Sequence, residues 1–103
     1  KDYIHVDDVA TALARLATEP VKGCVDVGTG EGVSLGVIAD TTASLMQSEH
    51  LLTKGSAPDP VGDLVASPVA LHGLGWSPEI RLADGIRAMI DDIRKAPKLQ
   101  NAR

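Results

Sequence analysis

Hydrophobic residues recur at helical spacing in three stretches of the chain: residues 7–19, residues 35–48, and a stretch that begins at Leu82 and ends before Pro97. Each stretch has one apolar face, and Thr11, Arg15 and Thr18 lie on the other side of the first. The three apolar faces consist of Val9, Ala10, Leu13, Ala14, Leu16 and Ala17; of Leu35, Ile38, Ala39, Leu45 and Met46; and of Ile86, Met89, Ile90 and Ile93. We therefore predict three main helices.

Short runs rich in β-favouring residues lie between the predicted helices, at residues 3–6, 24–27 and 64–66. Strands that alternate with helices are typical of an α/β fold. We predict that fold class for this chain, with short strands alternating with the three main helices. Leu51 and Leu52 suggest one further extended stretch, and a loop rich in Gly, Pro and Asp is expected at residues 54–63.

Local signals place the ends of the helices. Asp7 is a suitable N-cap for the first helix, with Asp8 in its first turn. Ser34 is a suitable cap for the second helix, and Ser67 followed by proline predicts a further short helix. A turn at residues 75–78 is expected to fix the ring of Trp76 against the core, while Tyr3 is expected to be a packed strand residue.

Composition narrows the class of protein. The chain has 103 residues, which corresponds to one domain or a piece of one, and its formal net charge is −4. Apart from the tail around Arg94, Lys95, Lys98 and Arg103, it has no basic stripe, and it has almost no aromatic residues, so no nucleic-acid partner is expected. No apolar run reaches the ~20 residues of a membrane span, so we expect no membrane partner. The single cysteine, Cys24, suits a reducing compartment and predicts a cytoplasmic protein.

Three glycines at alternate positions, Gly28, Gly30 and Gly32, join a predicted strand to a predicted helix. A dinucleotide fingerprint would need another glycine where Val33 stands. The stretch also resembles the first motif of methyltransferases that use S-adenosylmethionine, although the chain after Met46 is short for that fold. The third interpretation is a tight structural turn that Ser34 caps.

Residues that could carry catalysis or bind a metal do not form a recognisable set. His5, His50 and His72 are scattered without metal-ligand spacing. The acidic pairs at residues 7–8 and 91–92 are interpreted as a helix cap and a solvated face. No catalytic, cofactor-binding or metal-binding residue is therefore assigned.

Four segments in order resemble the extended short-chain dehydrogenase/reductases, the family of the nucleotide-sugar epimerases and dehydratases. They are Lys-Asp-Tyr-Ile-His-Val-Asp-Asp at residues 1–8, the strand and glycine turn at 26–34, Leu-Gly-Trp-Ser-Pro at 74–78, and Leu-Ala-Asp-Gly-Ile at 82–86. The resemblance covers the C-terminal third of such an enzyme. It implies that residues 1–97 are a substrate-binding C-terminal region, and residues 98–103 are expected to be a disordered tail.

The resemblance also implies site residues, a cofactor and partners. Lys1 and Asp59 match family positions that contact the nucleotide of the substrate, so both are expected to bind a nucleotide sugar. NAD or NADP would bind the complete enzyme outside this segment, with none bound by this chain alone. The implied partners are an N-terminal Rossmann domain of the same enzyme, which carries the catalytic Tyr-x-x-x-Lys pair, and further copies in a homo-oligomer. Tyr3 is not that tyrosine, because Asp7 and not lysine follows it in the pattern.

Two consequences remain open at this point. Ser56 and Ala66 replace charged residues of the family, which leaves a non-catalytic interaction module derived from the same fold as the alternative, with a methyltransferase fragment less favoured. The apolar faces of the first two helices are expected to pack against a partner domain. Without that domain, we expect the chain to dimerise or aggregate.

Overall fold

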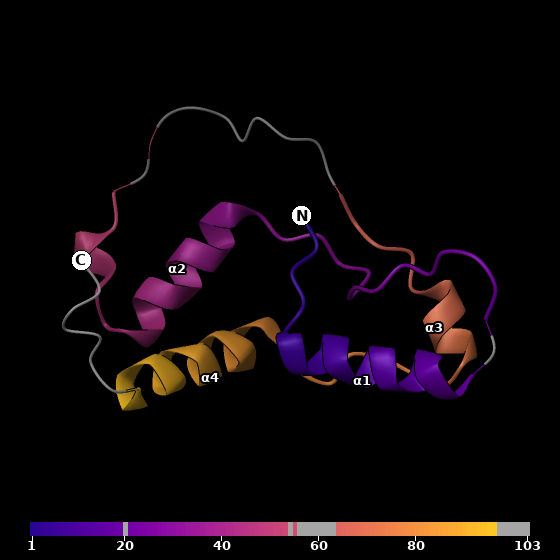
Figure 1. Ribbon diagram of the computed structural model, residues 1–103. Helices are drawn as coiled ribbons and strands as arrows, with labels where there is room; N and C mark the ends of the chain where they lie inside the picture. The colour runs from indigo at the N-terminus through magenta and orange to yellow at the C-terminus, as the bar shows by residue number, and fades with distance from the viewer. Residues whose placement is uncertain (20, 54, 56–63, 97–103) are drawn as a thin grey trace, which may run out of the picture.

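The computed structural model describes residues 1–19, 21–53, 55 and 64–96. Its elements are α1 (Val6–Thr18), α2 (Leu35–Leu45), the short 3-10 helix η1 (Glu49–Leu51), α3 (Val69–Gly73) and α4 (Leu82–Lys95). Figure 1 shows α1 and α3 at one end of the molecule and α2, η1 and α4 at the other, with the N-terminal segment between them. The predicted loop at 54–63 and the predicted tail at 98–103 lie outside the described residues, apart from Gly55.

The predicted α/β fold class is wrong: all the regular structure in the described part of the chain is helical. Residues 1–5, 24–27 and 64–66 form no strand. Neighbouring backbones do bond at isolated points, where Val33 N–H donates to Lys1 O at 2.7 Å and Asp2 N–H donates to Leu64 O at 2.9 Å. A sheet needs a continued ladder of such pairs. Here the N–H groups next to these points donate instead to carboxylate side chains.

The first helix begins one residue earlier than predicted, and a different residue caps it. His5 is the N-cap, and its Nδ1 accepts a hydrogen bond from Asp7 N–H at 3.0 Å. The sequence prediction of Asp7 as the cap is therefore wrong. Val6, predicted to end a strand, is the first residue of the helix instead.

The buried stripe of α1 is rotated from the predicted face. Asp8 and Ala12 are buried, and the neighbouring Val9 and Leu16 are half-buried. Leu13 is 56% exposed, and the alanines at 10, 14 and 17 are exposed as well. The helical periodicity is confirmed, but the side that the chain itself buries is the one that carries a carboxylate.

A small core lies between α1, α3 and the non-helical residues 24–27. Ala12, Leu71 and Trp76 are its buried members. The indole N–H of Trp76 donates to Thr11 Oγ1 at 2.9 Å, so the large ring is buried with its one polar group satisfied. This confirms that the turn holds Trp76 against the core, and it shows that Thr11, although exposed, contributes its hydroxyl to this contact. Ile4, Leu16, Val25, Val27 and Leu74 surround this core.

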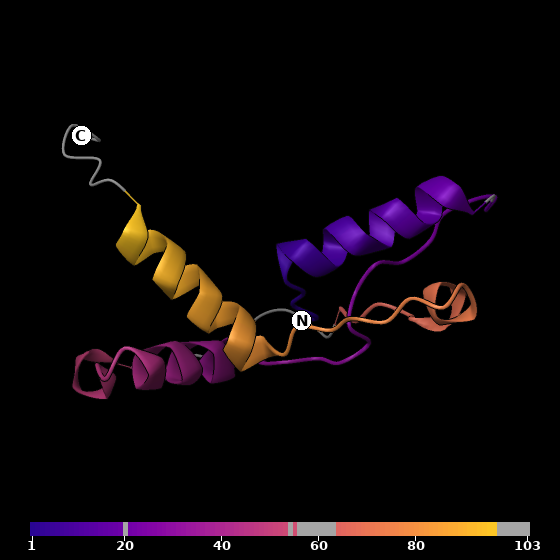
Figure 2. The same cartoon turned by 90° about the horizontal axis from the view of Figure 1, so that it is seen from below.

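The other end of the molecule is built from α2 and α4, which contact each other directly. Ser34 caps α2 as predicted, because its Oγ accepts from Val37 N–H at 3.1 Å. Figures 1 and 2 together show that the two helices cross at an angle, since their N-terminal ends overlap in Figure 2 but lie apart in Figure 1. Met46, Met89 and Ile93 of this end remain exposed to solvent.

Several element ends differ from the predictions by one to three residues. α2 ends at Leu45 and not at residue 48, and Leu51 belongs to η1 and not to an extended stretch. α3 has Pro68 as its N-cap in place of Ser67, with no side-chain cap bond. Ends of helices are the least determined part of a sequence pattern because several neighbouring residues can serve as caps.

Gln47 adopts a left-handed conformation, with φ of 53°, just after the end of α2. Ser48 N–H donates to Ala43 O at 2.8 Å across this residue, which is the bond of a Schellman cap. Glycine is the usual residue at this position because it has no Cβ.

We predict that Gln47→Gly raises the free energy of unfolding by about 0.5–1 kcal/mol. Glycine removes the strain of the left-handed conformation, and this gain is partly offset because glycine also gives the unfolded chain more conformational freedom. Urea unfolding monitored by circular dichroism measures it. Gln47→Ala keeps a Cβ and is the control, so equal stabilisation by both variants would contradict the explanation.

Candidate functional site

The carboxylate of Asp2 joins three segments that are distant in sequence. Its oxygens accept hydrogen bonds from Thr29 N–H at 3.0 Å, Thr29 Oγ1 at 2.5 Å, Gly30 N–H at 2.9 Å and Ala66 N–H at 3.2 Å. Partial desolvation would raise the pKa of Asp2, but the four hydrogen bonds favour the ionised form and together hold its pKa below the ordinary value. Asp2 is therefore a charged anchor that fixes the glycine turn and the chain around Ala66.

Gly28 allows this close approach. A Cβ at this position would lie 2.5 Å from the Ala66 side chain and 2.6 Å from an oxygen of Asp2. Gly30 is required for a different reason, since its φ is +81°. The interpretation of this stretch as a tight structural turn is thus supported by both contacts and conformation.

The same geometry bears on a nucleotide cofactor at the glycine turn. The backbone N–H groups of Thr29 and Gly30 are the donors that a phosphate would need there, and both already donate to Asp2. An ionised carboxylate at that point also repels phosphate. The residues of the turn therefore do not fit a dinucleotide phosphate.

A second carboxylate holds the other wall of the site. Asp8 is 3% exposed, and its two oxygens accept from Glu79 N–H at 3.1 Å and from Ile80 N–H at 3.0 Å. These bonds tie the segment before α4 to the first turn of α1. The prediction that Asp8 lies in the first turn of α1 is confirmed, but its side chain is buried and bonds to residues 79–80, which the sequence did not predict.

Between these two anchors lies a polar hollow of about 500 Å³. The glycine turn and the segment before α4 form its walls, and it presents hydroxyl, carboxylate and guanidinium groups. Such a surface can hydrogen-bond a hydroxylated ligand in both directions. Its lining residues are Tyr3, Thr29, Glu31, Val33, Pro78, Glu79, Ile80, Arg81 and Leu82.

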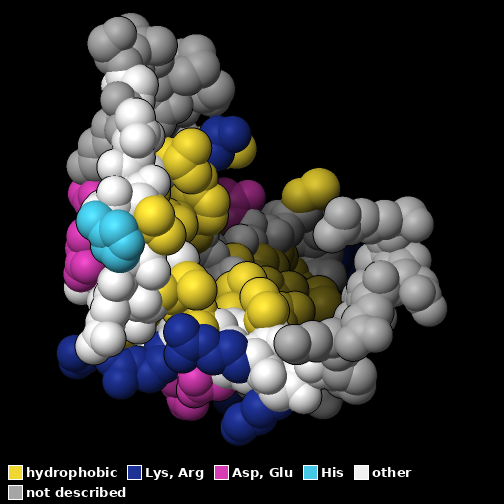
Figure 3. Space-filling model, turned by 90° about the vertical axis from the view of Figure 1, so that its left-hand side faces the viewer, with side chains coloured by type: hydrophobic (Ala, Val, Ile, Leu, Met, Phe, Trp, Pro, Cys, Tyr) yellow, Lys and Arg dark blue, Asp and Glu magenta, His cyan; other side chains and the backbone are white. Residues whose placement is uncertain are grey.

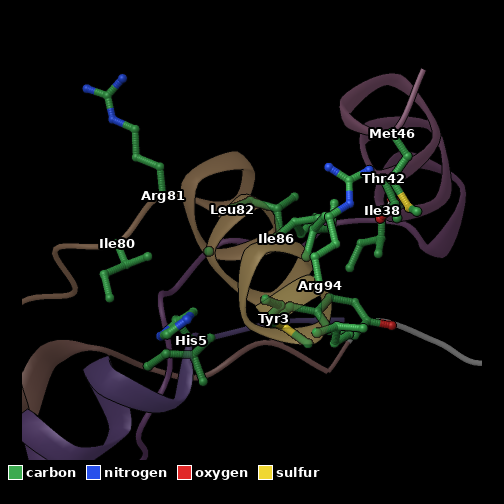
Figure 4. A pocket seen from close by; sticks show the side chains of 15 residues that line it. Tyr3, His5, Ile38, Thr42, Met46, Ile80, Arg81, Leu82, Ile86 and Arg94 are labelled. Atoms are coloured by element: carbon green, nitrogen blue, oxygen red, sulfur yellow. Dashed lines mark hydrogen bonds between the residues drawn. The ribbon is translucent and has the colours of Figure 1, made fainter. Parts of the chain in front are cut away.

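An apolar groove of about 430 Å³ adjoins the polar hollow, and Tyr3 and residues 80–82 line both. Figure 3 shows hydrophobic side chains gathered around a hollow on this face. In Figure 4, Arg81 points away from the other lining side chains, whereas Arg94 lies among them. The groove is lined by Tyr3, Ile4, His5, Ile38, Thr42, Met46, Ile80, Arg81, Leu82, Gly85, Ile86, Met89, Ile90, Ile93 and Arg94.

Of the two residues predicted to bind substrate, Lys1 and Asp59, the structure describes only Lys1. The backbone of Lys1 is bonded to Val33, a lining residue of the polar hollow, with the terminal amine donating to Val33 O at 3.0 Å. Lys1 itself lines neither the polar hollow nor the apolar groove. Asp59 lies outside the described residues. Both assignments stay predictions.

The sequence did not predict the roles of Asp2, Asp8 and Arg81. Tyr3 was predicted to be a packed strand residue, whereas in the structure it lines both the polar hollow and the apolar groove. One signal was present: a Gly-Thr-Gly turn exposes backbone N–H groups that need an acceptor. Nothing in the sequence shows which of the acidic residues reaches that turn.

Neither a metal-binding cluster nor a membrane-spanning helix is found in the described part of the chain. Among residues 1–19, 21–53, 55 and 64–96, no group of three or more His, Cys, Asp or Glu side chains is placed to hold a metal ion. None of the described helices is long and apolar enough to cross a membrane.

Comparison with known proteins gives partial similarity to nucleotide-sugar enzymes. The chain is 32% identical over 90 residues to a putative GDP-L-fucose synthase 2 of rice, Oryza sativa subsp. japonica. It is 30% identical over 97 residues to the GDP-L-fucose synthase of Escherichia coli K12, and 27% identical over 100 residues to an Escherichia coli dTDP-4-dehydro-6-deoxyglucose reductase. These matches include 84%, 84% and 91% of this chain. No family model matches it.

The chain spans only 26%, 30% and 31% of the length of these relatives. The matched stretch lies in their C-terminal part, and the relatives are nucleotide-sugar enzymes of the short-chain dehydrogenase/reductase type. These matches confirm that the chain is similar to the C-terminal part of such enzymes.

We predict that Asp2→Asn lowers the free energy of unfolding at neutral pH by about 1–2 kcal/mol, after allowance for the solvent that screens this half-exposed group. Because the folded pKa of Asp2 lies below the unfolded one, its contribution is complete above the unfolded pKa and disappears as pH falls through the folded pKa. Urea unfolding from about pH 6 down to about pH 2 measures this dependence. The exposed Asp92→Asn is the matched control, and an acid dependence unchanged by Asp2→Asn would contradict the anchor role.

Gly28→Ala tests the close approach at the turn. The added methyl group meets Ala66 and Asp2, so we predict a loss of about 1–3 kcal/mol in the free energy of unfolding. Gly73→Ala, where a Cβ meets nothing within 4 Å, is the control and is expected to be neutral or slightly stabilising. Thermal and urea unfolding of both variants decide the point.

Proposed function

We propose that this chain is the nucleotide-sugar-binding portion of an NAD(P)-dependent epimerase, dehydratase or reductase. The observation that carries the proposal is that the similar proteins are named for GDP- and dTDP-linked sugars and, in a CDP-abequose synthase of Salmonella muenchen that is 26% identical over 96 residues, for a CDP-linked sugar. A nucleoside diphosphate joined to a hexose is the chemistry that these names share. The four ordered motifs of the sequence support the same class.

In the complete enzyme, NAD or NADP supplies hydride transfer, and an N-terminal Rossmann domain holds it together with the catalytic tyrosine and lysine. The glycine turn of this chain does not fit the cofactor phosphates, because Asp2 occupies the donor groups. This chain's own contribution is to bind and orient the substrate. Lys1 neutralises a phosphate of the nucleotide as a point charge, and Asp59 accepts hydrogen bonds from the ribose.

The polar hollow is the part of the structure that suits the hydroxylated end of such a substrate. Its carboxylates, Glu31 and Glu79, accept hydrogen bonds from hydroxyl groups, and Arg81 donates them. Asp2 and Asp8 hold the two walls, so these groups need little reorganisation on binding.

Calorimetric titration of the chain with GDP-, CDP- and dTDP-hexoses tests the proposal. We predict binding of at least one nucleotide sugar and no measurable binding of NAD. Lys1→Ala and Asp59→Asn are each expected to weaken that binding about fivefold to tenfold. Lys95→Ala, at the far end of α4, is the control and is expected to leave binding unchanged.

Two results would count against this function: micromolar binding of NAD by the chain, or the absence of binding to every nucleotide sugar. The second result favours the alternative, a non-catalytic interaction module. The exposed apolar surfaces of α1 and of the groove are the observations in favour of that alternative. Circular dichroism of each variant separates loss of binding from loss of folding.

A further inference from the structure

One face of α1 is apolar and exposed. Val6 is 71% exposed and Leu13 is 56% exposed, and the small side chains of Ala10, Ala14 and Ala17 lie with them at helical spacing. We call these five residues the α1 face. Their spacing is that of a helix that inserts its apolar side into a groove.

The apolar groove is the natural counterpart in size. Its side chains are large and flexible or branched, and Met89 and Ile93 are among its exposed members. A ridge of alanines with two larger anchors can approach such side chains closely, since small residues let helices come together and large ones fill the space. The groove is lined by residues of both α2 and α4, which cross at an angle (Figures 1 and 2).

The charges around the two surfaces are opposite. The formally charged residues that line the groove are Arg81 and Arg94, both cationic. At 3.6 residues per turn, Asp7 borders the α1 face, whereas Arg15 lies nearly opposite to it. The side chain of Asp7 is 75% exposed, and although one of its oxygens lies 3.8 Å from His5 Nδ1, the carboxylate remains accessible to a cation at the rim of a groove.

Within one molecule, α1 begins beside the groove, where its N-cap His5 is a lining residue, and runs away from it, so the α1 face does not lie in the groove of its own copy (Figure 1). A contact between them joins different copies, and each copy then keeps one free surface of each kind. Such a head-to-tail contact is heterologous, and it continues from copy to copy until a ring closes.

We propose that the chain self-associates by docking the α1 face of one copy into the apolar groove of the next. The occupant of the groove is a second copy of this chain. Val6 and Leu13 serve as anchors among Ile86, Met89 and Ile93, with Asp7 close to an arginine at the rim. This inference rests on the two surfaces and not on the proposed nucleotide-sugar function.

Complementary variants test this contact. Leu13→Lys blocks the α1 face, and Ile93→Lys blocks the groove. Both side chains are mostly exposed, so both variants are expected to keep the helical circular dichroism of the unsubstituted chain. Val69→Lys, on the exposed surface of α3 and outside both surfaces, is the matched control.

Light scattering with size exclusion measures the outcome. The unsubstituted chain and Val69→Lys are expected to gain mass with concentration beyond a dimer, while Leu13→Lys and Ile93→Lys each stay at the 10.7 kDa of the monomer. Mixed in equal amounts, the two blocked variants still offer one intact α1 face and one intact groove. The mixture is therefore expected to reach about twice the monomer mass and stop there.

Any of four results overturns the proposal. They are a monomeric unsubstituted chain at all concentrations, undiminished association of Leu13→Lys, a mixture of the blocked variants that remains monomeric, and loss of association in Val69→Lys. A monomeric unsubstituted chain would indicate that another domain covers the α1 face and the groove. Undiminished association of Leu13→Lys would indicate a symmetric contact between two grooves.

Discussion

Two carboxylates do in this structure what a sheet ladder does in others. The non-helical segments between the helices carry backbone N–H groups that need acceptors. Asp2 satisfies N–H groups of Thr29, Gly30 and Ala66, and Asp8 satisfies those of Glu79 and Ile80. Charge-assisted bonds of this kind are stronger than neutral ones, so a few of them can hold segments that make little regular structure.

The candidate site depends on these anchors. The polar hollow lies between the glycine turn, fixed by Asp2, and the segment before α4, fixed by Asp8. The functional groups of the hollow are therefore separate from the groups that position it.

The sequence predicted the helices well because their periodicity is a local property. The cap at Ser34 was also predictable, since it depends on residues close together in the chain. The burial of Trp76 and the structural role of the glycine turn were predicted from residue type alone, and the distant partners of both, Thr11 and Asp2, were not. The strands were not predictable, because a β-favouring run becomes a strand only when a continued ladder forms beside it. The roles of Asp2 and Asp8 were missed for the same reason: their partners lie 27 to 72 residues away.

The position of the single tryptophan has a consequence for how this protein can be observed. Trp76 is buried against α1 and α3, at the opposite end of the molecule from α2 and α4. Its fluorescence therefore reports the environment of one end, whereas circular dichroism averages the helices of both. Coincidence of the two signals during unfolding would mean that the bonds from Asp2 and Asp8 transmit cooperativity across the whole chain. Separate transitions would identify the α2–α4 end as an independent unit of local stability.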